Sequence, residues 1–270
     1  MKISLIITTY NWKEALEAVL ESVKRQTQLP DEVVIADDGS TASTRELISQ
    51  FKKNFPVPLI HSWQEDDGFR AAQSRNKALA KTTGDYIIMI DGDIILSRNF
   101  IKTHCLHASP GWFVQGGRAK LNESQTEKIL KKLVIPNIFS RGIKNRKNSL
   151  SSHFLSKLFS YKSNTAKKTR TCNLAVWKKD IIAINGFDNN FIGWGREDSE
   201  FVERLLFSGK NRLYLKFASI CFHLHHNENA RLQLPENQKI LENTIRHKKI
   251  KTENGIDYYL AKKTSDTSTK

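Results

Sequence analysis

Two aspartates separated by a single glycine interrupt an apolar part of the sequence. Asp91 and Asp93 flank Gly92, and apolar runs at 86–90 and 94–96 lie on either side. Because an unpaired charge is costly to bury, carboxylates in such a setting need a partner. Carboxylate oxygens suit Mg²⁺ and Mn²⁺, which often complete their shell with substrate phosphates. The pattern predicts a divalent-cation site, with a plain Asp-Gly turn as the alternative.

A second pair of carboxylates follows a glycine-rich turn in the C-terminal half. Glu197 and Asp198 open a predicted helix, and Trp194 stands before them between Gly193 and Gly195. Acidic residues at a helix start complement the helix dipole, and that structural role is the alternative for this pair. It does not explain the tryptophan, whose flat ring and N–H suit the face of a sugar. The segment therefore predicts sugar binding beside two acidic groups.

Three histidines lie together at the end of a predicted late strand. In an extended strand His223 and His225 share one face, whereas His226 points to the other. One of them could add a nitrogen ligand to a cation held by the aspartates. A structural role is the alternative, and it must hold for at least one of the three.

The first hundred residues alternate between short apolar runs and amphipathic segments. The pattern predicts strands at 3–9, 32–37, 58–63 and 85–90, with helices at 12–26, 44–54 and 70–82 between them. Apolar strands separated by helices favour a parallel sheet covered on both faces, whose ligands bind at the carboxyl ends of the strands. The sequence therefore predicts one site at this edge, because polar clusters follow the strands at 8–11, 37–40, 65–68 and 91–93.

The rest of the chain has a less regular pattern. Weak periodicity at 120–170 indicates a mobile insertion with one short helix inside it. Order returns at 171–187, and a helix is predicted at 196–209 with Gly209 as its terminator. Late strands follow, and the polar tail after Ile256 is expected to fray.

The positive charge is concentrated in one segment. The formal net charge is +15, and between 128 and 179 there are fourteen Lys and Arg without one Asp or Glu. Such a cluster attracts an anionic membrane, and an apolar patch could dip into the interface. We expect a peripheral membrane contact through 141–170, with a solvated loop as the alternative. The patch would consist of Phe154, Leu155, Leu158 and Phe159.

The sequence lacks the motifs of several functional classes. The absence of GxGxxG and GxxxxGK[ST] argues against a dinucleotide-binding Rossmann domain and a P-loop. Three cysteines without CxxC spacing predict neither a disulfide framework nor a zinc knuckle, and they indicate a reducing compartment. No signal peptide is visible and no apolar run approaches about 18 residues, so we expect a cytoplasmic protein.

These segments together resemble a known enzyme family. The N-terminal half is similar to a family 2 glycosyltransferase of the GT-A fold in ISLIITTYN, EVVIADDGS, GFRAAQSRNKAL and GDYIIMIDGD. NGFDNNFIGWGREDSEFVERLL is similar to the galactosyltransferase-type C-terminal segment, which also occurs in β-1,4-galactosyltransferases and bacterial chondroitin-type polymerases. The resemblance implies an α/β protein with the nucleotide-diphospho-sugar transferase fold, in which helices flank a mostly parallel central sheet.

The resemblance also implies a division of the chain. Residues 1–118 would form the nucleotide-sugar-binding half, and 171–256 the acceptor-binding and catalytic half of the same domain. The basic insertion at 119–170 would separate the halves, and 257–270 would be a flexible tail.

At the nucleotide, the resemblance implies that Asp38 reads the uracil ring and that Arg70 contacts the nucleotide. Asn76 lies on the same helix as Arg70, and the backbone of 8–10 lies beside Asp38. The expected nucleotide-binding set is Thr8, Thr9, Tyr10, Asp38, Arg70, Asn76 and Asp91.

At the reacting centre, Asp91-Gly92-Asp93 looks like the DxD motif, with Asp93 as the direct ligand of Mn²⁺ or Mg²⁺ and Asp91 beside it. His223 matches the family's histidine ligand best, and His226 is the alternative. Asp198 resembles the catalytic base and Glu197 its neighbour that grips a sugar. Trp194, Gly195 and Asp67 would contact the acceptor or the sugar. Relatives often have GWGGED where this chain has Arg196, so sugar specificity does not carry over.

These roles imply an inverting transfer of a hexose or N-acetylhexosamine from a UDP-sugar to a hydroxyl of a glycan, such as a lipopolysaccharide or capsule precursor. The cation would neutralise charge on the departing diphosphate, and Asp198 would accept the proton of the attacking hydroxyl.

Two alternatives from other classes stay open at this point. One is a basic nucleic-acid-binding protein, although basic charge alone supports only non-specific binding and no recognition motif is present. The other is a metal-dependent phosphotransferase that uses Asp91 and Asp93. An enzyme of the haloacid-dehalogenase type would carry its DxD after the first strand and not after the fourth.

Overall fold

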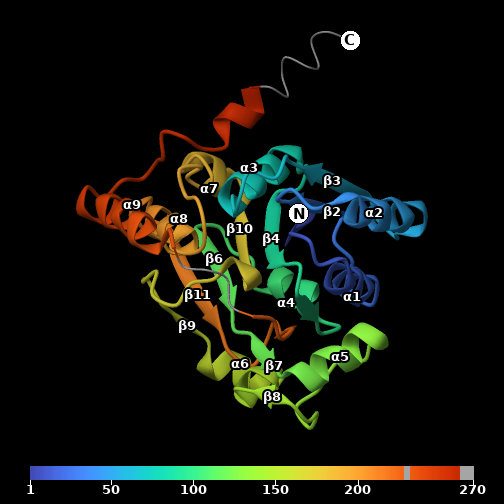
Figure 1. The fold of residues 1–270 in the computed structure, drawn as a ribbon. Helices are drawn as coiled ribbons and strands as arrows, with labels where there is room; N and C mark the ends of the chain where they lie inside the picture. The colour runs from blue at the N-terminus through green and yellow to red at the C-terminus, as the bar shows by residue number, and fades with distance from the viewer. Residues whose placement is uncertain (228–231, 262–270) are drawn as a thin grey trace.

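Parallel strands form the N-terminal half of the main sheet. The computed structural model describes residues 1–227 and 232–261. Its first strands are β1 (Ile3–Thr9), β2 (Glu32–Asp37), β3 (Leu59–Trp63) and β4 (Tyr86–Asp91). Between them run the helices α1 (Lys13–Lys24), α2 (Ala42–Asn54) and α3 (Ala71–Lys81), as Figure 1 shows. The elements predicted for this half are thereby confirmed, with boundaries shifted by a few residues.

Each strand of this half is buried on both faces because successive side chains enter different cores. Leu5 of β1 packs with Leu16 of α1 in one cluster. Ile6, the next residue, packs with Leu79 of α3 in the other cluster. Strands that are apolar throughout therefore need helices on both sides, and the chain supplies them.

The C-terminal half extends the same sheet with strands of both directions. These strands are β6 (Trp112–Gly116), β9 (Tyr161–Lys162), β10 (Leu174–Trp177) and β11 (Asn211–Leu215). Strand β10 runs antiparallel between β4 and β6, so the order among the described residues is β3-β2-β1-β4-β10-β6-β11-β9. The helices of this half are α7 (Lys178–Ala183), α8 (Glu197–Phe207) and α9 (Leu234–Arg246).

The strand that follows β4 belongs to a second, smaller sheet. It is formed by β5 (Ile94–Leu96), β12 (Cys221–His223), β7 (Ala119–Leu121) and β8 (Ile143–Lys144), in that order. The helix α4 (Phe100–Leu106) follows β5. Strands β5 and β12 are antiparallel, and Ile94 lies opposite His223. This pairing brings the histidine-rich segment next to the aspartates that follow β4.

The segment 119–170 contains more structure than the single short helix predicted from the sequence. It holds two α-helices, α5 (Glu123–Lys131) and α6 (His153–Phe159), besides β7, β8, β9 and the 3₁₀ turn η1 (Arg146–Ser149). Asn122 caps α5 by accepting from the Gln125 backbone, and Ser152 caps α6 in the same way from Leu155. These helices are too short for a clear period, so the sequence pattern understates them.

The end of the described chain is more structured than the frayed tail expected after Ile256. Residues 257–261 are helical, and Tyr259 and Leu260 pack against the second core cluster. The remaining part of the expected tail, 262–270, lies outside the described residues. None of the helices in the described part of the chain is both long and apolar enough to cross a membrane.

Candidate active site

The DxD turn is held against the first strand by a close backbone contact. In the sheet register Thr8 of β1 lies opposite Asp91 of β4, and the Gly92 backbone N–H donates to the Thr8 carbonyl over 2.6 Å. A Cβ at position 92 would lie 2.7 Å from that carbonyl oxygen. Only glycine therefore allows the two aspartates to sit at this edge of the sheet.

Asp93 and two histidines converge on one point. The Asp93 Oδ2 lies 3.2 Å from the Nε2 of His223 and 3.2 Å from the Nε2 of His226. The ligand atoms of all three lie within 4.8 Å of one another. The strand alternation placed His226 on the opposite face from His223, and that expectation is wrong because β12 ends at His223 and the alternation stops with it.

The donor set of this cluster suits a divalent cation. Asp93 Oδ1 is buried without a hydrogen-bond partner among the described residues, so the carboxylate has an oxygen to spare. Burial acts to raise the pKa of Asp93, but the hydrogen bond from His226 and the charge of His223 lower it overall. Burial lowers the pKa of His223 to about 4, which keeps its ring neutral as metal ligation requires. The residues present therefore fit Mn²⁺ or Mg²⁺ with oxygen and imidazole ligands.

One arginine joins the two acidic pairs of the site. Arg75 is buried on α3, and its Nη2 lies 3.6 Å from Asp91 Oδ1. Its Nη1 lies 3.4 Å from Glu197 Oε1 and 3.6 Å from Asp198 Oδ1. Arg75 thus provides the positive charge between carboxylates that come from β4 and α8.

Crowding and burial keep part of this acidic cluster protonated near neutral pH. Burial, opposed by Arg75, raises the pKa of Asp91 to about 6. Burial and the adjacent Asp198 raise the pKa of Glu197 to about 7. Two like charges on neighbouring residues of one buried helix turn disfavour each other, which is the electrostatic cause.

Asp198 is oriented by a residue from the other side of the site. Thr171, in the 3₁₀ turn η2 (Thr171–Asn173), donates its backbone N–H to Oδ2 and its hydroxyl to Oδ1, both over 2.9 Å. The side chain of Asp198 is 23% exposed, against 11% for Glu197. Asp198 is therefore the member of the pair that is more accessible to a substrate.

The turn before Asp198 needs its glycines. Gly193 and Gly195 have φ of +75° and +104°, in the left-handed region that glycine tolerates best. The Gly193 backbone N–H donates to the Phe69 carbonyl over 2.8 Å, which ties the turn to the start of α3. Trp194 is 38% exposed at the tip of this turn.

Asp38 occupies a buried position at the nucleotide-binding edge that the sequence predicts. Its Oδ2 accepts from the Arg70 backbone N–H over 2.8 Å, and its Oδ1 accepts from Gln64 over 2.5 Å. Its own backbone N–H donates to the Thr9 carbonyl over 3.0 Å. Burial raises the pKa of Asp38 to about 6. The carboxylate therefore lies between the ends of β1 and β2 and the start of α3.

Two family models match this chain. The model described as glycosyl transferase family 2 matches residues 4–173, which is more than half of the chain. The chain belongs to glycosyltransferase family 2. A second model, described as the N-terminal domain of galactosyltransferase, matches residues 151–227 and so contains the Gly-Trp-Gly turn, Glu197, Asp198 and the histidines.

Several curated relatives of this glycosyltransferase are themselves transferases or synthases. Validoxylamine A glucosyltransferase of Streptomyces hygroscopicus subsp. limoneus is 25% identical over 230 residues, covering 75% of this chain and 47% of that protein. Hyaluronan synthase of Pasteurella multocida is 27% identical over 226 residues, covering 75% and 22%. Chondroitin synthase of Escherichia coli is 25% identical over 226 residues, covering 77% and 32%. The chain thus spans less than half the length of each of these three relatives.

Solved structures confirm the GT-A fold. Staphylococcus aureus TarS 1–349 in complex with UDP superposes with a TM-score of 0.60 at 16% identity, covering 97% of this chain and 70% of that one. The mannosyltransferase PcManGT of Pyrobaculum calidifontis, in complex with GDP-Man and Mn²⁺, gives 0.56 at 18% identity, covering 82% and 56%. The chain is thus a family 2 glycosyltransferase with the GT-A fold, and this membership replaces the nucleic-acid-binding and phosphotransferase alternatives.

The glycosyltransferase site does not bring together every predicted residue. Asn76 is fully buried, and its amide is used inside the fold. It donates to the Phe187 carbonyl and to Asn189 and accepts from the Phe187 backbone N–H. Asn76 therefore fixes α3 to the following half of the chain, with its amide bonded inside the fold, and the nucleotide contact expected for it stays a prediction.

Other predicted residues lie at the rim of the site. Asp67 is exposed and forms an ion pair with Arg70. The Tyr10 hydroxyl donates to Asp66 over 2.9 Å, and its side chain is largely exposed. The Thr8 hydroxyl donates to Asp91 over 3.1 Å, inside the site.

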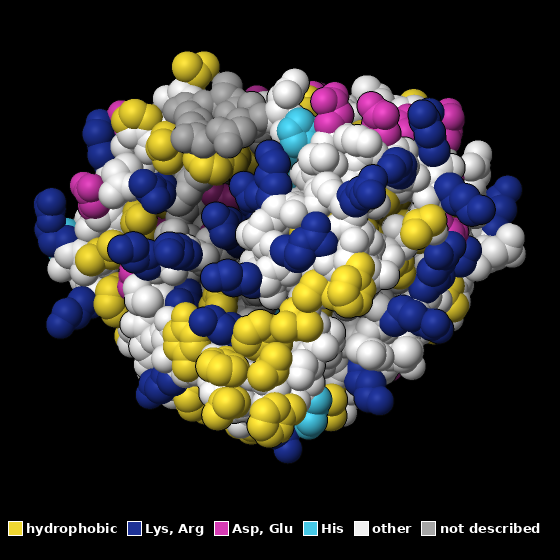
Figure 2. Space-filling model, turned by 90° about the horizontal axis from the view of Figure 1, so that it is seen from below, with side chains coloured by type: hydrophobic (Ala, Val, Ile, Leu, Met, Phe, Trp, Pro, Cys, Tyr) yellow, Lys and Arg dark blue, Asp and Glu magenta, His cyan; other side chains and the backbone are white. Residues whose placement is uncertain are grey.

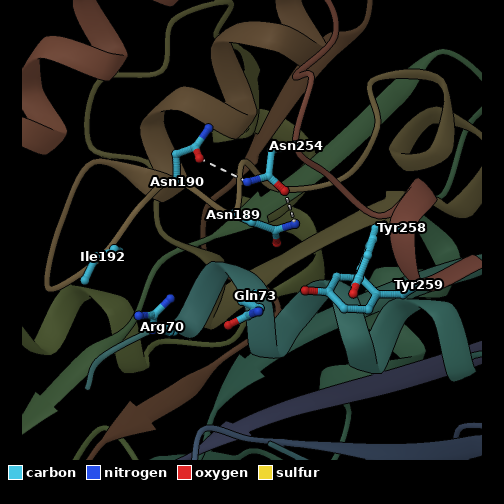
Figure 3. Close-up of a pocket in the computed structure, with 8 residues that line it drawn as sticks. All are labelled: Arg70, Gln73, Asn189, Asn190, Ile192, Asn254, Tyr258 and Tyr259. Atoms are coloured by element: carbon cyan, nitrogen blue, oxygen red, sulfur yellow. Dashed lines mark hydrogen bonds between the residues drawn. The ribbon is translucent and has the colours of Figure 1, made fainter. Parts of the chain in front are cut away.

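Arg70 also borders a cavity of about 390 Å³ that the sequence analysis did not predict. Figure 3 shows Arg70 and Gln73 on one side and a group of asparagines on the other. Asn254 donates to Asn190, and Asn189 donates to Asn254, both over 3.0 Å. Two tyrosines and one isoleucine complete the lining, namely Tyr258, Tyr259 and Ile192.

Three residues of the site were missed by sequence reasoning: Arg75, Thr171 and Arg118. Arg118, in the turn after β6, lies near enough to Asp91 and Asp93 for their charges to act to raise its pKa. A signal for Arg75 was present, because it lies three or four residues from Ala71, Ala78 and Leu79 on the buried side of α3. A charged residue on an apolar face calls for a partner. Thr171 and Arg118 carry no comparable pattern, since their roles depend on long-range contacts.

Proposed function

We propose that this glycosyltransferase moves a hexose or N-acetylhexosamine from a UDP-sugar to a hydroxyl of a glycan acceptor, with a divalent cation at Asp93. The observation that carries the proposal is the convergence of Asp93, His223 and His226 at the carboxyl edge of the sheet. Asp38 and Asp198 lie at the same edge. Asp38 would bind the nucleotide, and Asp198 would accept the proton of the acceptor hydroxyl.

The nucleotide would lie along the ends of β1, β2 and β4. Asp38 can accept a hydrogen bond from the uracil N3–H, because its carboxylate is fixed between Gln64 and the Arg70 backbone. The backbone of 8–10 would border the base, and the Arg70 guanidinium would contact the nucleotide from the start of α3. TarS, a protein of the same fold, is solved in complex with UDP, whereas PcManGT of this fold is solved with GDP-Man. The choice of UDP therefore rests on Asp38 as an acceptor for the uracil N3–H.

Asp93, His223 and His226 would hold the cation, with Asp91 next to them. A bound Mn²⁺ or Mg²⁺ supplies Lewis-acid stabilisation of negative charge on the leaving diphosphate. The chain's own contribution is the fixed arrangement of these side chains: Gly92 pins the turn to β1, and β12 brings the histidines to it. The PcManGT complex contains Mn²⁺, which supports a divalent cation in a chain of this fold.

Asp198 would take the proton of the acceptor hydroxyl as it attacks the anomeric carbon. Thr171 orients both of its oxygens, and Asp198 is more accessible than Glu197. Because the pKa of Glu197 is raised to about 7, Glu197 retains a proton in a large share of molecules at neutral pH. Its protonated carboxyl would donate a hydrogen bond to a sugar hydroxyl, while Asp198 acts as the base.

The acceptor would approach over the Gly-Trp-Gly turn. Trp194 presents an exposed ring on which a sugar can stack. Ile192, two residues earlier, lines the cavity of Figure 3, whose amides and tyrosines suit the hydroxyls of a carbohydrate. Gly195 and Asp67 would border this path from the turn and from the loop before α3.

The basic segment would hold the enzyme against an anionic membrane that carries a lipid-linked acceptor. Figure 2 views the molecule from the side where α5, α6 and β8 lie, and hydrophobic side chains gather there among Lys and Arg. Phe139 is 89% exposed, Phe154 74% and Leu158 65%. Exposed aromatic residues within a cationic surface suit the interface of an anionic bilayer. The enzyme would then lie on the inner face of the plasma membrane.

Vesicle binding tests the membrane contact with point variants. Deleting 141–170 would remove β9, which pairs with β11, so a deletion would disturb the sheet. The double variant Phe154→Ser and Leu158→Ser should instead reduce sedimentation with vesicles that contain phosphatidylglycerol. Ile245→Ser, on an exposed position of α9, is the control. Equal sedimentation of all three proteins would argue against the contact.

A donor screen tests the proposed reaction itself. With Mn²⁺ present, UDP should raise the melting temperature of the protein, whereas ADP and duplex DNA should not. A panel of UDP-sugars, read by UDP release, should then identify the donor. If no UDP-sugar is turned over and UDP does not bind, the proposed donor class is wrong.

A further inference from the structure

A second cavity, lined by positive charge, lies near the cluster of Asp93, His223 and His226, because Lys120 of its lining pairs with His223 in the smaller sheet. It has a volume of about 150 Å³, and Arg118, Lys120, Lys168 and Arg170 contribute to its lining. Among the described residues no acidic side chain lines it. The salt bridges found in the described part of the chain include none of these four residues, so none of the four cations has a direct ion-pair partner there.

The backbone that carries Arg118 is fixed in place. Asn148 donates its side-chain amide to the Arg118 carbonyl over 2.8 Å, and Asn145 donates to the same oxygen over 3.1 Å. Asn173 donates to the neighbouring Gly117 carbonyl over 2.8 Å. Three asparagines from two segments thus hold the turn between β6 and β7, and they make the cavity a built feature and not a gap between loops.

Arg118 lines this cavity and also lies near the two aspartates of the DxD turn. Its Nε is buried and has no hydrogen-bond partner among the described residues. Its Nη1 donates to the thiol of Cys172 over 3.5 Å, which is its one hydrogen bond within residues 1–227 and 232–261. Burial opposes its charge, but the nearby carboxylates of Asp91 and Asp93 favour it, and the pKa of its guanidinium is raised. Arg118 is therefore a permanent cation, close to the DxD turn, with donors to spare.

We propose that this cavity binds a carboxylate or phosphate group carried by one of the sugar substrates of the enzyme. The inference rests on the proposed glycosyltransferase reaction and narrows its substrate to an anionic sugar. Clustered like charges repel one another, and an anion would offset that repulsion. Arginine in particular presents paired donors that match a carboxylate or a phosphate. The volume accommodates such a group and a small part of a sugar ring, but not a nucleotide.

The anionic group could belong to the donor or to the acceptor, and calorimetry separates these sources. In the donor arm, the Mn²⁺-loaded protein is titrated with UDP, UDP-glucose and UDP-glucuronic acid. In the acceptor arm, glucuronic acid, glucose 6-phosphate and glucose are titrated into the protein, both with and without UDP. We expect an anionic ligand to bind about tenfold or more tightly than its neutral counterpart in at least one arm, as a charge-assisted contact provides.

Variants of the cavity should remove this preference. Lys168→Met with Arg170→Met changes two exposed cations of the lining and should abolish the difference between anionic and neutral ligands, while UDP affinity stays unchanged. Lys167→Met with Arg141→Met makes the same charge change in the same segment outside the cavity, and it should keep the preference. The single variant Arg170→Gln, with a smaller expected loss, guards against misfolding of the double variant.

Two results would overturn the proposal. Equal affinity for anionic and neutral ligands in both arms would mean that the cavity has no such role. A loss of UDP affinity in the Lys168/Arg170 variant would mean that the cavity serves the diphosphate of every donor. A failure of UDP to bind the wild-type protein would refute the proposed donor instead, and the titrations without nucleotide would still decide about the cavity.

Discussion

Arg75 of α3 donates to Glu197 of α8 across 3.4 Å, although the two residues are 122 positions apart in the sequence. The same guanidinium lies 3.6 Å from Asp91 of the DxD turn. Carboxylates from the end of β4 and the start of α8 therefore share one buried guanidinium. The charge balance of the whole site depends on this residue.

Replacing Arg75 with methionine should destabilise the protein by about 3 kcal/mol at neutral pH, because it leaves buried carboxylates without their counter-charge. The loss should shrink as the pH falls, since Asp91 and Glu197 then take up protons and lose their charge. Chemical denaturation across a pH series measures both effects. Lys81→Met, at the end of the same helix, removes the same charge from an exposed position and should have little effect. A loss that does not depend on pH would point to packing as the cause.

Both histidines should contribute to cation binding. We expect His223→Ala and His226→Ala each to weaken Mn²⁺ binding by at least about tenfold, since even indirect partners of a metal contribute that much. Titration followed by electron paramagnetic resonance measures the affinity. His225→Ala is the matched control, because His225 is held through its backbone N–H by Thr126 and lies outside the cluster. Unchanged affinity in either of the two variants would remove that residue from the ligand set.

Asp198 and Glu197 should differ in their effect on turnover. Asp198→Asn should lower kcat by about 10²- to 10⁴-fold, the usual contribution of a general base, without changing UDP affinity. Glu197→Gln should cost less, because an amide can still donate to a sugar hydroxyl. Glu203→Gln on the same helix is the control. The reverse order, with Glu197→Gln the more damaging variant, would assign the base to Glu197.

UDP affinity should depend on pH through Asp38, whose pKa is raised to about 6. Uracil N3–H needs an acceptor, so affinity should fall as the pH drops through that value, and UDP binding below it should release a proton. Folding raises this pKa, so the stabilising effect of Asp38 is largest below the unfolded value of 3.8 and is lost as the pH rises through 6. Calorimetry in buffers of different ionisation enthalpy tests the proton release. Asp38→Asn should bind UDP weakly and without this pH dependence.

The sheet strands β1–β4 and the helices between them could be predicted from the sequence because their patterns are local. Apolar runs such as 86–90 and the helical face of α1 require no knowledge of the rest of the chain. The contacts that complete the site are of another kind. Arg75 reaches Asp198, and Thr171 reaches it from the opposite side, only because β10 inserts antiparallel between β4 and β6.

Short elements limited the prediction further. Strands β8 and β9 have two residues each, so no period can reveal them. The direction of His226 was wrong for a related reason: alternation holds only while a strand continues, and β12 stops at His223. The sequence indicated which residue types belong to the site, but the positions of strand ends decided where their side chains point.

The pairing of β5 with β12 brings together residues that are more than a hundred positions apart in the chain, with Ile94 opposite His223. The ribosome therefore makes β5 well before β12. A growing polypeptide that has passed Asp93 but not yet His223 has only one of the three proposed cation ligands. In the proposed reaction, cation binding would therefore require the complete fold. A chain that lacks the histidines would not activate a nucleotide sugar for cleavage.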